Sequence, residues 1–212
     1  MRALLKQTIS RLQADYVVLH NGEALYEIRV PFSVYPLNIE IYDNKGHLYT
    51  VKSTIVGDAP VTQRQMYRIL PSSGFEEGQV ARRRNYINVT WAATYDRFFR
   101  GHEYTAYEIG AWRDGMYYPI YEGAQQVAMI HKGTKVHGNL DEYELYALEQ
   151  KGMLAAVIYA SYLDVLKYRN IGEFSKHKVQ VKYAISLSKK TRALMEKIFM
   201  DRSGLREGKY EK

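Results

Sequence analysis

The chain has 212 residues, of which 46% are hydrophobic, a composition that suits one globular domain with a short appendage. It contains no cysteine, which excludes disulfide bonds and thiolate chemistry, and its apolar runs fall short of the roughly 20 residues of a membrane-spanning helix. Residues 1–15 lack the apolar core of a signal peptide, so we expect a cytoplasmic protein, at most peripheral to a membrane.

The net charge of +7 is unevenly distributed along the chain. Residues 167–212 contain 13 Lys and Arg against 5 Asp and Glu, a net charge of +8, whereas residues 1–166 have a net charge of −1. A basic segment of this kind indicates an anionic partner, such as a membrane surface or nucleic acid. The alternative is a solvated tail that only keeps the protein soluble.

The first 15 residues are expected to form a segment of their own. Leu4, Leu5, Ile9 and Leu12 fall on one stripe of a helix. The spacing therefore predicts an amphipathic helix over Met1–Ala14, ahead of the main domain.

From Tyr16 to Leu148 the dominant hydrophobic period is two. Apolar side chains alternate with their neighbours in residues 24–30, 38–42, 86–91 and 142–147. Turn sequences separate these runs: Asn21-Gly22, Asp43-Asn44-Lys45-Gly46, Arg113-Asp114-Gly115, Glu122-Gly123 and His137-Gly138-Asn139. Alternation with hairpin turns predicts a meander of short antiparallel strands, including one near Gln65–Leu70 beside a longer loop.

The stretch Met153–Leu166 is apolar on nearly every side, so a helix formed by it has to be buried all round. A helix is about 10–12 Å across, and a barrel of about 11 strands can hold one along its axis. We therefore predict a mainly β (α+β) fold, a closed antiparallel barrel of about 12 strands around a central hydrophobic helix at about 149–168. The alternative is a helix packed between a sandwich and a second layer.

Residues 171–212 are predicted to form a basic C-terminal extension. Alternation over residues 179–185 predicts a strand, and Ser188–Met200 predicts an amphipathic helix. Its apolar side consists of Leu194, Met195, Ile198 and Phe199. This side can dock on the barrel or on a second copy, or it can lie at a membrane interface.

The order of elements from Tyr118–Lys132 through Asn139–Tyr146 to the apolar helix resembles bacterial proteins of the tubby C-terminal-like superfamily. That group includes LURP-one-related proteins and phospholipid scramblases, and Ile39–Tyr49 is similar to its strand-turn-strand unit. The resemblance covers residues 16–170 and implies a closed barrel of about 12 strands around a hydrophobic helix. The extension departs from it, and the phosphoinositide-binding residues of true tubby domains match no position here.

Catalytic and metal-binding signatures are absent from the sequence. It has no His-Glu-x-x-His pair, no Gly-x-Ser-x-Gly elbow and no phosphate-binding glycine loop, so we expect no metal, no cofactor and no enzymatic activity. Asp164, inside the apolar stretch, is expected at the barrel mouth, in contact with water or backbone amides. An enzyme would instead need a polar cavity with a paired Asp164.

Two basic clusters are the candidate phosphate or lipid sites. Arg82, Arg83 and Arg84 are predicted in a loop before a strand, where three guanidinium groups can hold phosphate. Lys189, Lys190 and Arg192 begin the predicted C-terminal helix. The leading hypothesis is a non-enzymatic barrel that binds anionic phospholipid or acts at the membrane surface. The alternative is a protein-interaction or homo-oligomerising module that docks through the C-terminal helix, with nucleic acid a less favoured partner.

Overall fold

The structure, a computed structural model, describes residues 1–10, 13–32, 38–54, 66–87, 90–111, 115–133, 140–168 and Phe199. For residues 83–87, 90–97, 110–111 and 167–168 it describes the backbone alone. The strands, in chain order, are β1 (Arg2–Ser10), β2 (Ala14–His20), β3 (Glu23–Val30), β4 (Asn38–Asp43), β5 (Gly46–Ser53), β6 (Met66–Pro71), β7 (Gly78–Ile87), β8 (Thr90–Phe99), β9 (His102–Tyr107), β10 (Ile109–Ala111), β11 (Gly115–Glu122), β12 (Gln125–Lys132) and β13 (Glu142–Ala147).

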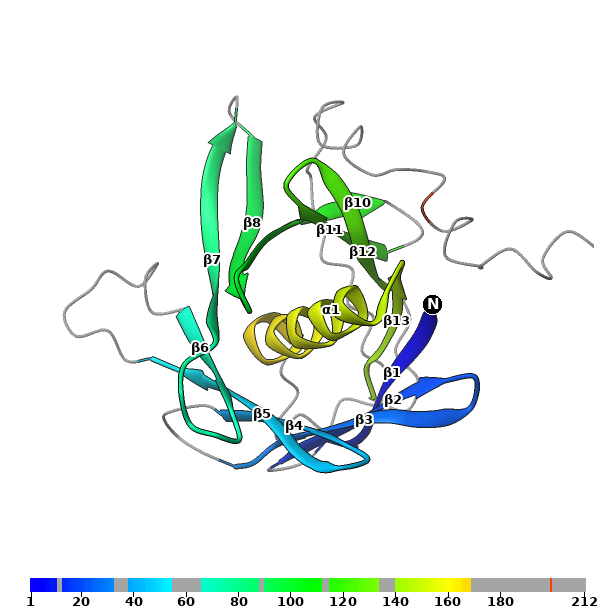
Figure 1. Cartoon of the computed structure of the whole chain (residues 1–212). Coiled ribbons are helices and arrows are strands. Elements are labelled where there is room, and N and C mark those ends of the chain that lie inside the picture. The colour runs from blue at the N-terminus through cyan, green and yellow to red at the C-terminus, as the bar shows by residue number, and fades with distance from the viewer. Residues whose placement is uncertain are drawn as a thin grey trace, which may run out of the picture.

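The strands form one antiparallel sheet that closes on itself (Figure 1). Each strand from β1 to β9 pairs with the next, β13 pairs with β1, and β11 pairs with both β12 and β9. The short β10 continues along the same edge of β11 that β9 occupies, because Ile109 pairs with Tyr117 and Ala106 pairs with Ile120. The result is a closed 12-stranded barrel, which confirms the predicted antiparallel barrel.

Helix α1 (Gln150–Leu163) lies inside the ring of strands in Figure 1. Every residue from Gly152 to Leu163 is buried, as the lack of a polar face in this stretch requires. Two tyrosines of the helix contact the wall. The Tyr159 hydroxyl donates a hydrogen bond to the Tyr104 backbone carbonyl at 3.0 Å. The Tyr162 ring packs edge-on against the Tyr67 ring, with 5.0 Å between the ring centres. The sheet is thus one closed layer around a helix, and not two facing sheets.

The barrel wall follows the predicted alternation. In β3, Tyr26, Ile28 and Val30 are buried, while Glu27 and Arg29 point outward and form an exposed ion pair. The inward-facing side chains of the wall and those of α1 form the main hydrophobic core. Full burial of one such apolar side chain stabilises the folded state by about 1.5–3 kcal/mol.

The predicted N-terminal helix is wrong, because residues 2–10 form β1. This strand pairs with β13 and with β2, so the barrel begins at the N-terminus and not at Tyr16. Ala3, Leu5 and Gln7 face inward and are buried, a period of two. Leu4 and Leu5 fit a helical stripe equally well, but a 12-strand ring needs this segment as the strand between β13 and β2.

The C-terminal predictions lie outside the described residues, apart from Phe199. This applies to the strand at 179–185 and to the helix at Ser188–Met200. After α1 the chain continues into a π-helical stretch, Asp164–Tyr168. Within the described part of the chain, no helix has both the length and the apolar character needed to cross a membrane.

Candidate functional site

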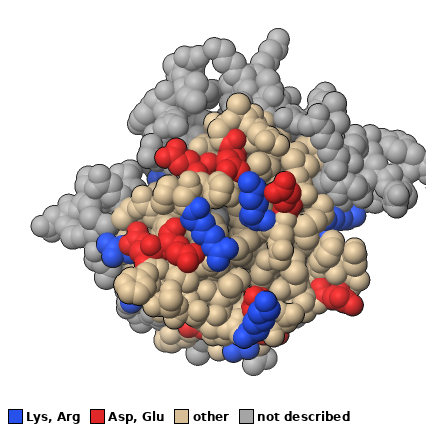
Figure 2. Space-filling view, viewed as in Figure 1, with Lys and Arg blue, Asp and Glu red and all other residues tan. Residues whose placement is uncertain are grey.

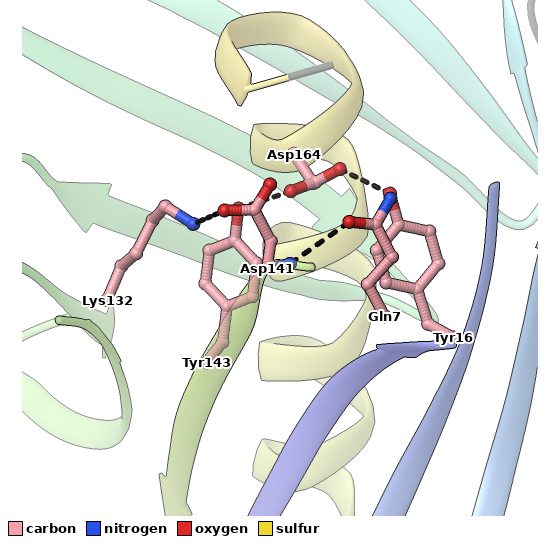
Figure 3. A network of polar contacts seen from close by, with 6 residues as sticks. All are labelled: Gln7, Tyr16, Lys132, Asp141, Tyr143 and Asp164. Atoms are coloured by element: carbon pink, nitrogen blue, oxygen red, sulfur yellow. Dashed lines mark hydrogen bonds and ion pairs between the residues drawn. The ribbon is translucent and has the colours of Figure 1, made fainter. Parts of the chain in front are cut away.

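Six polar side chains gather inside the barrel where α1 ends (Figure 3). They come from β1, β2, β12, β13, the residue before β13 and the first residue after α1, and each is at most 4% exposed. The members are Gln7, Tyr16, Lys132, Asp141, Tyr143 and Asp164, and we call this set the polar cluster. Buried polar groups at this density require mutual hydrogen bonds, since each unpaired group costs free energy.

Asp164 is the centre of the polar cluster. Its side chain is held between two tyrosines: the Tyr143 hydroxyl donates to Oδ1 at 2.5 Å, and the Tyr16 hydroxyl donates to Oδ2. The residue is 1% exposed, so the prediction of a carboxylate at the barrel mouth, bound to water or backbone amides, is wrong. The two bonds connect the end of α1 to β2 and to β13.

An ion pair lies beside Asp164. The Lys132 ammonium donates to Asp141 Oδ1 and lies 4.2 Å from the centre of the Tyr143 ring. Gln7 joins the two halves of the cluster, because its Oε1 accepts from the Asp141 backbone N–H at 3.0 Å and its Nε2 donates to the Tyr16 hydroxyl at 3.3 Å. All six residues therefore belong to one connected network.

The pKa of Asp164 is raised chiefly by its burial, and the second carboxyl group of the polar cluster adds to the rise. Burial raises the pKa of Asp164 to about 6, and the neighbouring Asp141 acts in the same direction. Lys132 and the two tyrosine hydroxyls oppose the rise. Burial, with Asp164 next, raises the pKa of Tyr16 well above its usual value, so its hydroxyl keeps the proton that it donates.

Chemically, the cluster fixes the helix within the barrel. Asp164 is paired, as an enzyme site would require, but all six side chains are buried, so a substrate cannot reach the carboxyl group unless the wall opens. The hydrogen bonds of Asp164 to Tyr16 and Tyr143 therefore hold the end of α1 against β2 and β13.

We expect the stability difference between the wild type and Asp164→Asn to depend on pH. An unfolded Asp titrates near 3.9, and Asp164 titrates at about 6 in the folded protein. Between these values the folded state binds more protons, so the free energy of unfolding falls as pH rises through this window. Asparagine does not titrate, so the wild type should gain stability relative to the variant when pH is lowered from about 7 to about 5.

Urea unfolding of both proteins at the two pH values measures this effect. Glu144, whose pKa is lowered to about 2, is present in both proteins. Its contribution to the free energy of unfolding is lost only when pH falls below the ordinary glutamate pKa of about 4.3, which is outside the tested range. A difference that stays constant, or that moves in the opposite direction, would show that Asp164 is not protonated in this range.

The first predicted anion site is arranged differently from the expectation. Arg82, Arg83 and Arg84 belong to β7, which pairs with β8 along its whole length, so the predicted loop is wrong. A strand has a side-chain period of two, which does not favour convergence of consecutive residues on one phosphate. The Arg82 side chain is half-buried, and its Nε is buried without a hydrogen-bond partner. Lys189, Lys190 and Arg192 lie outside the described residues.

An apolar patch on the outside of the barrel is absent from the sequence-based expectations. Ala128 and Ile130 face the core, whereas Met129 between them packs with Tyr146 and Phe199 in a separate buried cluster. Tyr117 and Leu148 border this cluster, and we call Tyr117, Met129, Tyr146 and Leu148 the outer patch. Residues 127–130 are all apolar, so the side chains on both faces of this strand are apolar, as in a strand that is covered on both sides. This run is the signal in the sequence that points to the outer patch.

Polar groups surround the outer patch. Glu144 is hydrogen-bonded to Arg2 at 2.6 Å, to the Tyr146 hydroxyl at 2.7 Å and to His131 Nδ1 at 2.8 Å. The His131 hydrogen bond is the largest of the causes that lower the pKa of Glu144 to about 2, so this residue is a carboxylate at neutral pH. The His131 ring also stacks on Tyr117, with 4.4 Å between ring centres. An anionic group is thus fixed beside the patch.

Positive charge is not concentrated on the described barrel surface. Figure 2 shows Lys and Arg interspersed with Asp and Glu on the face that it presents. The described side chains include more Asp and Glu than Lys and Arg. Many of the basic ones form ion pairs: Arg2 with Glu144, Lys6 with Glu142, Arg29 with Glu27, Arg68 with Glu76, Arg100 with Glu77 and Lys151 with Glu122.

A search against protein-family models and a search of curated proteins find no match for this chain. In the part of the chain that the structure describes, no group of three or more His, Cys, Asp or Glu side chains is placed to hold a metal ion.

Proposed function

We propose that the protein is a non-enzymatic, tubby-like barrel that binds anionic lipid at a membrane surface through its basic C-terminal extension. The closed 12-stranded ring with α1 along it supports the tubby-like assignment. Because α1 occupies the interior of the ring, the position where a carrier barrel holds its ligand is filled by the chain itself. Binding is therefore assigned to the outside of the molecule.

The charge distribution is the observation that carries this proposal. Residues 167–212 have a net charge of +8, whereas the described barrel surface is mixed in sign and richer in carboxylates. An anionic membrane attracts basic segments with about 1 kcal/mol per Lys or Arg near the surface, and the attraction falls off within a Debye length. The extension has the charge for such binding, and the barrel serves as the folded domain that presents it.

We expect neutralisation of the first basic cluster of the extension to weaken vesicle binding. The triple variant Lys189→Gln, Lys190→Gln and Arg192→Gln removes three charges, worth about 3 kcal/mol in total, or on the order of 100-fold in affinity. Co-sedimentation with vesicles that contain phosphatidylserine measures this loss.

A matched control removes three exposed charges from the barrel: Lys45→Gln, Lys52→Gln and Arg68→Gln. This control has the same net charge as the test variant, and we expect its affinity to stay within about threefold of the wild type. If the two triple variants lose affinity equally, net charge alone drives binding and the extension has no special role.

The alternative function, an interaction or oligomerising module, is favoured by one observation. Phe199, in the extension, is fully buried in contact with Met129 and Tyr146 of the barrel. A second copy offers the same outer patch, so exchange of the extension between two molecules would form a dimer. Under this hypothesis the full chain is dimeric in sedimentation, and removal of residues 188–212 makes it monomeric.

A further inference from the structure

We propose that the outer part of the β7–β8 hairpin inserts into an anionic membrane surface, with an uncharged tip in the lipid interface and an arginine base among the headgroups. We call this part, residues 82–87 of β7 and 90–93 of β8, the ribbon. The proposal rests on the proposed membrane function. It adds to the C-terminal extension a second lipid contact, which the barrel itself supplies.

The ribbon extends beyond the barrel wall. β7 pairs with β6 only as far as Ala81, and β8 pairs with β9 only from Thr94 onward. Beyond these residues the two strands pair with each other, up to Ile87 and Thr90, and no other described strand pairs with them. Figure 1 shows this hairpin rising out of the ring. Because a two-stranded ribbon alone is marginally stable in water, a surface that covers it would stabilise it.

Positive charge is confined to the base of the ribbon. Arg82, Arg83 and Arg84 are the first residues of β7 beyond its pairing with β6. The next residues, 85–95, contain no charged side chain and no proline, and their aromatic members are Tyr86, Trp91 and Tyr95. A single-stranded nucleic acid requires basic groups along the path of its backbone. Separation into a basic base and an aromatic tip is instead typical of a segment that enters a membrane interface.

The arginine base suits a layer of headgroups better than a single phosphate. The strand period of two places Arg82 and Arg84 on one face of the ribbon and Arg83 on the other. Positive charge is therefore present on both faces, as a hairpin that stands in a headgroup layer requires. The ribbon continues for three residues beyond Arg84, to Ile87, which is about 10 Å at strand spacing. Interfacial segments bury their apolar part to a similar depth, about 5–10 Å.

The ribbon lies at the end of the barrel where the chain leaves α1. The ring of Tyr162, in the last turn of α1, lies 5.0 Å from that of Tyr67. Tyr67 pairs with Val80, next to the base of the ribbon. The basic residues 167–212 follow α1 in the sequence. The start of this basic segment and the ribbon are thus at the same end, so one membrane surface can contact both.

Trp91 is the natural probe of the ribbon, because the chain has only two tryptophans. Trp112→Phe leaves Trp91 as the only indole of the full-length protein, so its fluorescence can be followed alone. Anionic vesicles should shift the Trp91 emission to shorter wavelength, and lipids with brominated acyl chains should quench it. Neutral vesicles should do neither, because they offer the arginine base no anionic headgroup.

Trp91→Lys separates insertion from charge. It adds a positive charge, so electrostatic attraction alone predicts tighter binding to anionic vesicles. Insertion needs the indole and predicts a loss of affinity on the order of tenfold. The matched control, Gln79→Lys, adds the same charge at an exposed position of β7 inside the wall and should bind at least as tightly as the wild type.

The arginine base is tested by Arg83→Gln combined with Arg84→Gln, which should weaken binding to anionic vesicles on the order of 30-fold. Thermal melting by circular dichroism checks that each variant is folded. If a variant does not fold, the Trp91 emission of the Trp112→Phe protein decides the proposal.

The outcomes distinguish this proposal from the membrane function itself. If the protein sediments with anionic vesicles while the Trp91 emission is neither shifted nor quenched, insertion is refuted and the membrane function stands. The same holds if Trp91→Lys binds as tightly as Gln79→Lys. If single-stranded oligothymidylate shifts the Trp91 emission and anionic vesicles do not, the ribbon binds nucleic acid instead. If the protein binds no vesicle, both proposals fail.

Discussion

Ala156→Glu is expected to prevent the protein from folding. Ala156 is 0% exposed in the middle of α1, so a glutamate there would place an unpaired charge and a longer side chain inside the ring. The effective cost of burying one ion is several kcal/mol, which is comparable with the total stability of about 5–15 kcal/mol of an ordinary domain. Ala160→Glu should fail in the same way, because Ala160 is equally buried.

Soluble yield and a cooperative thermal transition by circular dichroism measure this outcome. Gln150→Glu is the matched control, because it introduces the same residue at an exposed position of the same helix. We expect the control to fold with a melting temperature close to that of the wild type. A soluble, cooperatively melting Ala156→Glu protein would contradict the placement of α1 in the core.

Asp164→Ala is the second change with a large expected effect. It removes the acceptor of two buried hydroxyls, those of Tyr16 and Tyr143. Each buried donor without an acceptor costs about 1–3 kcal/mol, and the loss of repulsion from Asp141 offsets part of this. We therefore expect the free energy of unfolding to fall by about 3 kcal/mol in urea titrations.

Two controls separate the network from a general effect of the substitution. Asp15→Ala removes a partly exposed carboxylate from β2, whose side chain accepts a hydrogen bond from Gln13 at 3.1 Å, and should change stability by at most about 0.5 kcal/mol. In a background that carries Tyr16→Phe and Tyr143→Phe, Asp164→Ala should cost much less than in the wild type, because no hydroxyl is then left without an acceptor. Equal costs in both backgrounds would show that the three residues are not coupled.

Most of the barrel can be predicted from the sequence, because its causes are local. The period of two, the turn sequences and the apolar stretch at Met153–Leu166 each require only neighbouring residues. The error at β1 has the opposite origin: Leu4, Leu5 and Ile9 satisfy a helical stripe, and the pairing that makes them a strand is with β13, at the far end of the barrel. The pairing with β13 that closes the ring makes this segment a strand, and a local sequence pattern does not reveal that pairing.

The candidate sites also combine features that the local sequence shows with contacts that it does not show. The two tyrosines that hold Asp164 are 148 and 21 residues away from it in sequence, so the composition of the apolar stretch gives no sign of its partners. The basic character of the C-terminal extension is visible at once, whereas its contact on the barrel depends on Met129 and Tyr146 meeting on neighbouring strands. The three arginines that begin at Arg82 suggested a loop by composition, and their pairing with β8 overrides that signal.

The basic C-terminal extension is proposed to bring this barrel to an anionic membrane surface. The most direct measurement is co-sedimentation of the full-length protein and of a version that ends at Leu187, with neutral and with anionic vesicles, at low and at high salt. We expect binding only to anionic vesicles, only by the full-length protein, and strongly reduced at high salt, because screening weakens the attraction. Absence of binding in every condition, or equal binding by both versions, would contradict this role of the extension.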